Sequence, residues 1–89
     1  MDAQAEMARI RAVKARYERK LMKKQNVVGV GIGFREVGGQ VTDQLALSVM
    51  VRQKLPLDQL RRRDIIPREL DGVVVDVKEV GTLRAEGVN

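Results

Sequence analysis

The hydrophobic pattern of the chain changes its period abruptly at Gln25-Asn26. Before this point, residues 1–24 contain no Gly or Pro and are rich in Ala, Arg, Lys, Glu and Met, which favour helices. After it, residues 27–34 read Val-Val-Gly-Val-Gly-Ile-Gly-Phe, an alternation that is typical of a strand. The sequence therefore predicts a long helix that runs directly into a β-sheet.

The predicted helix over residues 1–24 is both amphipathic and basic. Its apolar side chains recur at helical spacing along one side: Met7, Ile10, Tyr17 and Leu21. The segment carries eight basic and three acidic side chains, whereas residues 25–89 carry nine of each, so the whole net charge of +5 lies in the helix. The apolar stripe can pack on the chain's own sheet or associate with a second helix, and both interpretations stay open.

A hairpin of two antiparallel strands is predicted after the helix. The first strand covers residues 27–34 and the second covers residues 44–54, with a Gly-rich turn at residues 37–40. The first strand has an apolar face and a bare face, and the bare face consists of Gly29, Gly31 and Gly33. Bare glycines allow close packing, either within the fold or against another subunit.

The second half of the chain is predicted to return to the same sheet. Pro56 ends the second strand, residues 57–63 favour a short helix, and residues 65–70 form a connector. Asp71-Gly72 is a turn signal, and residues 73–80 alternate as a third strand. A right-handed crossover through the short helix would place this strand parallel to one strand of the hairpin.

The expected fold is a single α+β domain of order α-β-β-α-β, with a three-stranded mixed sheet and a long N-terminal helix. A chain of 89 residues has room for one small core. Within it we expect a basic helix at 1–24, a body at 25–81 and a C-terminal tail at 82–89 that is ordered by a partner, if at all.

The residue types that the chain lacks exclude several kinds of catalytic and metal site. The chain has no Cys and no His, so thiol nucleophiles, His-based triads and Cys/His metal sites are excluded. Ser48 is the only serine and has no base to activate it. We therefore expect no enzyme activity, no catalytic residue, no cofactor and no metal. No apolar stretch is long enough for a membrane span, and we expect a cytoplasmic protein without membrane contact.

A run of three arginines, Arg61, Arg62 and Arg63, is the densest basic cluster. Cations at the end of a helix are stabilising, so the run can be a solvated helix end. It can also contact phosphates or an acidic patch on a partner. The glycine run of the first strand is not a nucleotide site, because a dinucleotide fingerprint needs another spacing and a helix that follows it.

Residues 26–34 (NVVGVGIGF), 45–56 (LALSVMVRQKLP) and 65–77 (IIPRELDGVVVDV) resemble the short region that precedes trypsin-like peptidase domains in many bacterial proteins. The resemblance implies a non-catalytic accessory domain. Residues 1–89 include no such peptidase domain, so the resemblance supplies no catalytic residue.

We expect a self-associating or scaffolding module that forms a homo-oligomer. Its expected interaction surface consists of the helix stripe, the bare strand face and the arginine run. One alternative is a regulatory or propeptide-like partner of a peptidase or other protein. Another is a nucleic-acid-binding module that uses the basic helix, although the chain has almost no aromatic residues for base stacking.

Overall fold

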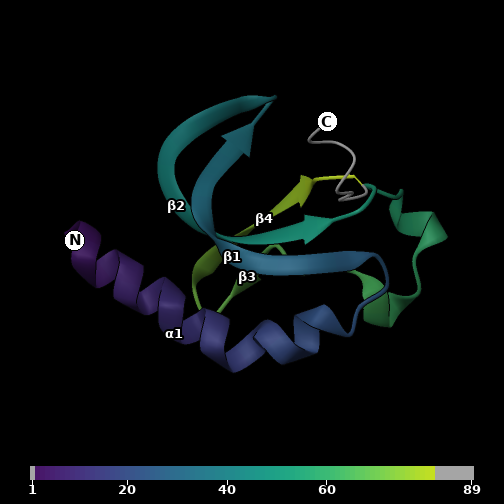
Figure 1. Cartoon of the computed structure of the whole chain (residues 1–89), viewed down its shortest axis with the longest axis horizontal. Helices are drawn as coiled ribbons and strands as arrows, with labels where there is room; N and C mark the ends of the chain where they lie inside the picture. The colour runs from purple at the N-terminus through teal and green to yellow at the C-terminus, as the bar shows by residue number, and fades with distance from the viewer. Residues whose placement is uncertain (1, 82–89) are drawn as a thin grey trace, which may run out of the picture.

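The computed structural model describes residues 2–81 and shows an α+β fold in which one helix packs on one face of a four-stranded sheet (Figure 1). Helix α1 (Ala3–Met22) is capped at its N-terminus by Asp2, whose carboxylate Oδ1 accepts a hydrogen bond of 2.7 Å from the backbone N–H of Ala5. Aspartate is a favoured residue at this capping position. The predicted N-terminal helix is confirmed, although it ends at Met22 rather than Lys24. The predicted tail, residues 82–89, lies outside the described residues.

The predicted hairpin and the parallel third strand are both present. Strands β1 (Val27–Val37) and β2 (Gln40–Val51) pair antiparallel, and β2 pairs parallel with β4 (Val73–Glu79). Between β1 and β2, Gly38 and Gly39 have φ values of 59° and 82°. A tight hairpin turn of this kind needs positive φ at both central residues, which glycine adopts without strain. Both strands therefore continue to the turn, beyond the predicted bounds.

The sheet has four strands, so the prediction of three is wrong. The additional strand, β3 (Glu69–Leu70), pairs antiparallel with β4 and gives the strand order β1-β2-β4-β3. The predicted turn at Asp71-Gly72 is present, with φ values of 50° and 81°. It closes a second hairpin whose first strand has only two residues. A strand this short shows no alternation, which is why the sequence pattern indicated only a connector.

The predicted short helix over residues 57–63 is also wrong. The segment forms two single 3-10 turns, η1 (Leu57–Gln59) and η2 (Arg62–Asp64). Leu60 (φ −113°, ψ 140°) and Arg61 (φ −67°, ψ 152°) separate them with an extended backbone. Polar groups at the end of the segment bond to the residues that follow α1. Asp64 Oδ1 accepts a hydrogen bond of 2.9 Å from the Gln25 N–H, and the Arg63 carbonyl accepts one of 2.6 Å from Lys24 Nζ.

The core is aliphatic and lies between α1 and the sheet. Helix α1 contributes Ile10, Val13 and Leu21, and the facing strands contribute mainly valine and leucine. These strand residues are Val27, Leu47, Val49, Val51, Val73 and Val75. Leu47 and Val49 of β2 have no exposed surface, because β2 lies between β1 and β4 in the sheet and under the helix.

The β1–β2 hairpin bends away from α1 and arches above β4 (Figure 1). Its pairing register shifts twice, between Val27 and Gly29 and between Phe34 and Glu36, and such bulges increase the bend of a strand. The arch brings Glu36 to β4, where its N–H donates a hydrogen bond of 3.0 Å to Asp76 Oδ2. The Glu36 carboxylate also lies 3.6 Å from Lys78 Nζ.

Candidate interaction surfaces

The predicted apolar stripe of α1 packs on the chain's own sheet. Ile10 and Leu21 are each only 2% exposed and belong to the core, and half-buried Tyr17 packs beside them. Met7 is half-buried, nearer the start of the helix. The stripe therefore packs within the fold, and Ile10 and Leu21 do not form a free surface for a second helix.

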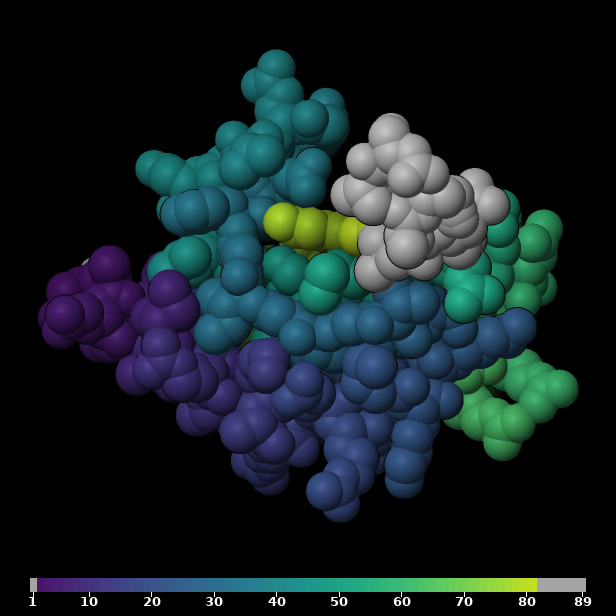
Figure 2. Space-filling view, in the orientation of Figure 1, coloured from purple at the N-terminus to yellow at the C-terminus, as the bar shows by residue number. Residues whose placement is uncertain are grey.

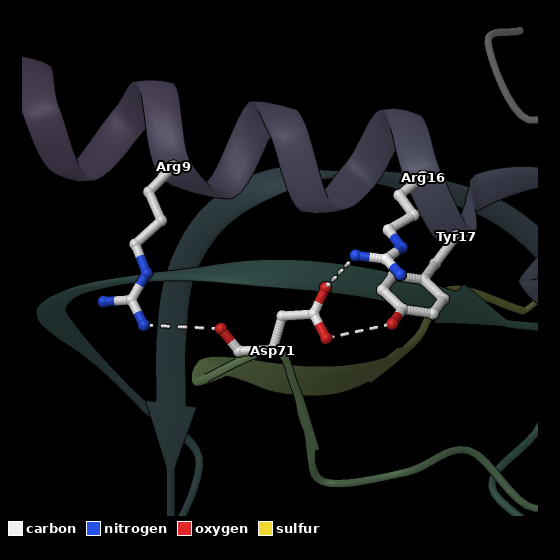
Figure 3. A network of polar contacts seen from close by, with 4 residues as sticks. All are labelled: Arg9, Arg16, Tyr17 and Asp71. Atoms are coloured by element: carbon white, nitrogen blue, oxygen red, sulfur yellow. Dashed lines mark hydrogen bonds and ion pairs between the residues drawn. The ribbon is translucent and has the colours of Figure 1, made fainter.

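Tyr17 also belongs to a polar network that ties α1 to the β3–β4 turn (Figure 3). Its Oη donates a hydrogen bond of 3.0 Å to Asp71 Oδ1, and Arg16 Nη1 lies 3.2 Å from Asp71 Oδ2. Arg9 Nη2 donates a 3.3 Å hydrogen bond to the Asp71 carbonyl. The hydrogen bond to Asp71 raises the pKa of Tyr17, since it favours the protonated phenol, and desolvation adds to this while the Arg16 cation opposes it.

The bare glycine face forms the inside of the arch, where the chain's own side chains cover part of it. A Cβ atom added at Gly33 would lie 3.0 Å from Ser48 Oγ and 3.3 Å from Lys78 Nζ, and one at Gly29 would lie 3.0 Å from Met50 Cε. At Gly31 the nearest such atom is 3.7 Å away, an ordinary contact distance. The glycines therefore allow close packing within the fold. Ser48 is buried there, and its hydroxyl has no hydrogen-bond partner in the described part of the chain.

The outer edge of β1 is the longest unpaired strand edge in the described part of the chain. β1 has eleven residues and stands at the end of the strand order, so β2 is its only partner among residues 2–81. Between the two bulges, Gly29 to Phe34 keep a regular register. At the turn end of the hairpin, three large apolar side chains are exposed: Phe34, Val37 and Val41.

A second surface is an open cleft of about 930 Å³ between the C-terminal half of α1 and residues 61–70. We call it the basic cleft. Five cations line it: Lys20, Lys23, Lys24, Arg61 and Arg63. Its apolar lining consists of Tyr17, Leu21, Pro67 and Leu70. In Figure 2 the recess lies at the lower right, between the blue end of α1 and the green segment that contains η2.

The basic cleft gathers part of the predicted surface and adds residues to it. It brings Tyr17 and Leu21 of the stripe together with Arg61 and Arg63 of the arginine run, which are distant in sequence. The remaining predicted residues, Met7, Ile10, Gly29, Gly31, Gly33 and Arg62, do not line it. The surplus charge of the helix was a visible signal for Lys20, Lys23 and Lys24, whereas nothing in the sequence pattern placed Pro67 and Leu70 beside them.

The described residues contain neither a cluster of metal ligands nor a helix that could cross a membrane. Among residues 2–81, acidic side chains do not gather in a group of three or more that could hold a metal ion. The one long helix in that range, α1, is too polar to cross a membrane.

Residues 2–80 match the family described as NARROW LEAF 1 N-terminal domain, a family named after a plant protein. No curated protein sequence matches the chain. The match spans all the residues on which the resemblance to bacterial peptidase-preceding regions was based, so that identification is wrong. The expectation of a peptidase partner drew on the same resemblance and loses this support.

Proposed function

The chain belongs to the NARROW LEAF 1 N-terminal domain family, and we propose that it is a non-enzymatic, self-associating module in which two copies join along the outer edges of their β1 strands. The observation that carries the proposal is the regular, unpaired stretch Gly29–Phe34 at the end of the sheet. Backbone N–H and C=O groups along such an edge are a template for another strand.

The composition of this stretch supports its use as an interface. Strand edges that stay free in solution are usually protected by charged residues, by proline or by bulges. Gly29 to Phe34 contain no charge and no proline, and the two bulges lie outside the stretch, one at each end. The chain therefore leaves this part of the edge unprotected where a protected edge would be expected.

The symmetry of an antiparallel pairing also suits a homodimer. A two-fold axis beside Gly31 or Ile32 would place that residue opposite the same residue of the second copy, so every contact is made twice, as a closed dimer requires. The pairing would lengthen the sheet from four strands to eight across the two copies. It would also bring the exposed apolar residues Phe34 and Val37 at the end of each β1 toward the partner, and covering apolar surface favours association.

The non-enzymatic part of the proposal rests on the residue inventory. The chain has no Cys or His, and the one serine is buried on the inside of the arch with no hydrogen-bond partner among the described residues. A serine nucleophile needs a base within hydrogen-bond reach. Ser48 has none, so its placement suits a packing role.

Sedimentation equilibrium of the purified chain tests the proposal. A single chain has a mass of 10.0 kDa. We expect the average mass to rise toward twice this value as the concentration increases through about the micromolar range, as a reversible dimer requires. A mass that stays at 10.0 kDa over the whole range would contradict self-association.

A further inference from the structure

We propose that the basic cleft binds an acidic segment of another protein, in which Asp or Glu residues flank one or two large apolar side chains. This binding site is separate from the β1 edge. The cleft is lined by Leu70 of β3, and β3 and β1 are the two opposite ends of the strand order. The inference therefore does not depend on self-association.

The walls of the basic cleft are held in place by hydrogen bonds between two distant segments. Lys24 Nζ donates to the Arg63 carbonyl at 2.6 Å, and the Gln25 N–H donates to Asp64 Oδ1 at 2.9 Å. Asp64 is only 8% exposed. These bonds fix Arg61 and Arg63 opposite the last turns of α1, so the cleft does not require the partner to assemble it.

The charge of the basic cleft is one-sided. Its five cations face a single acidic residue, Asp64, which is buried and occupied by the Gln25 N–H. None of the five cations forms an ion pair with any residue in the range 2–81. Arginine binds carboxylates through two parallel hydrogen bonds, and lysine adds a compact positive charge. A ligand that carries several carboxylates would match this arrangement.

The apolar lining distinguishes a peptide from a simple anion. Half-buried Tyr17, Pro67 and Leu70 line the cleft, with Leu21 buried beneath them. A free phosphate would leave this lining exposed to water, whereas an apolar side chain between two acidic residues would cover it. Helical or extended segments that alternate anchors and charges bind in grooves of this kind.

The same lining argues against a nucleic acid. Sequence-tolerant binding of single strands relies on bases that stack on free aromatic faces. Tyr17 is the only aromatic residue of the cleft, and the Arg16 guanidinium already lies 5.5 Å from its ring centre. Its hydroxyl is engaged by Asp71. The cleft thus supplies charge for phosphates but no platform for bases.

Fluorescence anisotropy tests the inference with a labelled synthetic peptide in which glutamates flank two leucines. The test variant is Lys23→Glu/Arg61→Glu, which reverses two cations of the cleft. The matched control is Arg11→Glu/Arg19→Glu, which makes the same change in net charge at exposed positions that do not line the cleft. Circular dichroism and light scattering show that each variant stays folded and keeps the oligomeric state of the native chain.

We expect the native chain and the control to bind the peptide with similar affinity, and the cleft variant to bind at least about tenfold more weakly. A peptide with serine in place of leucine should also bind more weakly. Equal losses in both double variants would show non-specific attraction and overturn the proposal, as would an absence of binding by the native chain. A single-stranded RNA of equal charge that displaced the peptide from the cleft at the same concentration would assign the site to nucleic acid instead.

Discussion

The Tyr17 hydroxyl donates a hydrogen bond of 3.0 Å to the Asp71 carboxylate, and this bond joins the C-terminal half of α1 to the β3–β4 turn across 54 positions of sequence. Asp71 has a φ of 50°, a backbone conformation that Asp and Asn adopt more readily than most residues. One residue therefore closes the turn and holds it against the helix.

The ionisation of Tyr17 should report this contact directly. The chain has a single tyrosine, so the ultraviolet absorbance of tyrosinate follows that residue alone. We expect its pKa to lie above the ordinary value of 10.0. Asp71→Asn keeps the turn conformation but removes the carboxylate, so the pKa should fall back toward 10.0. An unchanged titration curve in Asp71→Asn would contradict the contact.

The raised pKa of Tyr17 also predicts the direction of a pH effect on stability. The folded pKa lies above the unfolded value of 10.0. The stabilisation by this group should therefore be fully present below pH 10.0 and be lost as the pH rises through the folded pKa. Urea unfolding of the native chain and of Tyr17→Phe should show a difference in unfolding free energy that shrinks above this pH. A difference that grew above it would contradict the sign.

The glycines of β1 should differ in what they tolerate, although the sequence pattern treats them alike. Gly33→Ala places a Cβ atom 3.0 Å from Ser48 Oγ and 3.3 Å from Lys78 Nζ, whereas Gly31→Ala places it 3.7 Å from the nearest such atom. We expect Gly33→Ala to cost about 1–3 kcal/mol more unfolding free energy than Gly31→Ala, as overpacking does. Thermal unfolding measures this. Equal costs would show that the inside of the arch is less tightly packed than the structure indicates.

Two apolar residues of α1 differ in burial, so truncating each to alanine should lower the unfolding free energy by a different amount. Ile10 is 2% exposed in the core, whereas Met7 is half-buried near the helix start. Ile10→Ala should lower the unfolding free energy by about 2–5 kcal/mol, because it leaves a cavity. Met7→Ala should cost about 1 kcal/mol or less, since less apolar surface is lost. If Met7→Ala proved the more costly, the helix would be docked in another register.

The elements with strong local signals were predictable from the sequence, and those defined by distant contacts were not. The helix, the long hairpin and β4 follow from periodicity and from glycine turns. The crossover rule predicts that β4 lies parallel to one strand of the hairpin, and the structure shows that this strand is β2. Strand β3 is too short to show a period. The predicted helix over 57–63 is absent, and Asp64 and the Arg63 carbonyl bond instead to Gln25 and Lys24 after α1, contacts that local propensity does not contain.

The predicted interaction surface was likewise only partly predictable from the sequence. The stripe, the glycines and the arginine run were all visible as patterns. Which of them face the chain's own core and which line a cleft depended on packing, so Ile10 and Leu21 are buried while Arg61 and Arg63 face Lys20 and Lys23 across a recess.

The exposed apolar end of the hairpin should contribute to association. Val37 is 53% exposed at the end of β1, so Val37→Lys should leave the folded monomer intact while it weakens dimerisation by about tenfold or more. Leu57→Lys is the matched control, since Leu57 is 66% exposed on η1, outside the sheet. Sedimentation equilibrium compares the two. A similar weakening in both variants would place the interface elsewhere.

Amide hydrogen exchange at two protein concentrations tests the proposed β1–β1 pairing most directly. Backbone N–H groups on the outer edge of Gly29–Phe34 have no partner strand among residues 2–81, so they should exchange quickly in the monomer. The proposal predicts that these amides become protected as the concentration rises, while the amides of α1 keep the same protection. Exchange in β1 that is equally fast at both concentrations, although the average mass has risen, would contradict assembly through this edge.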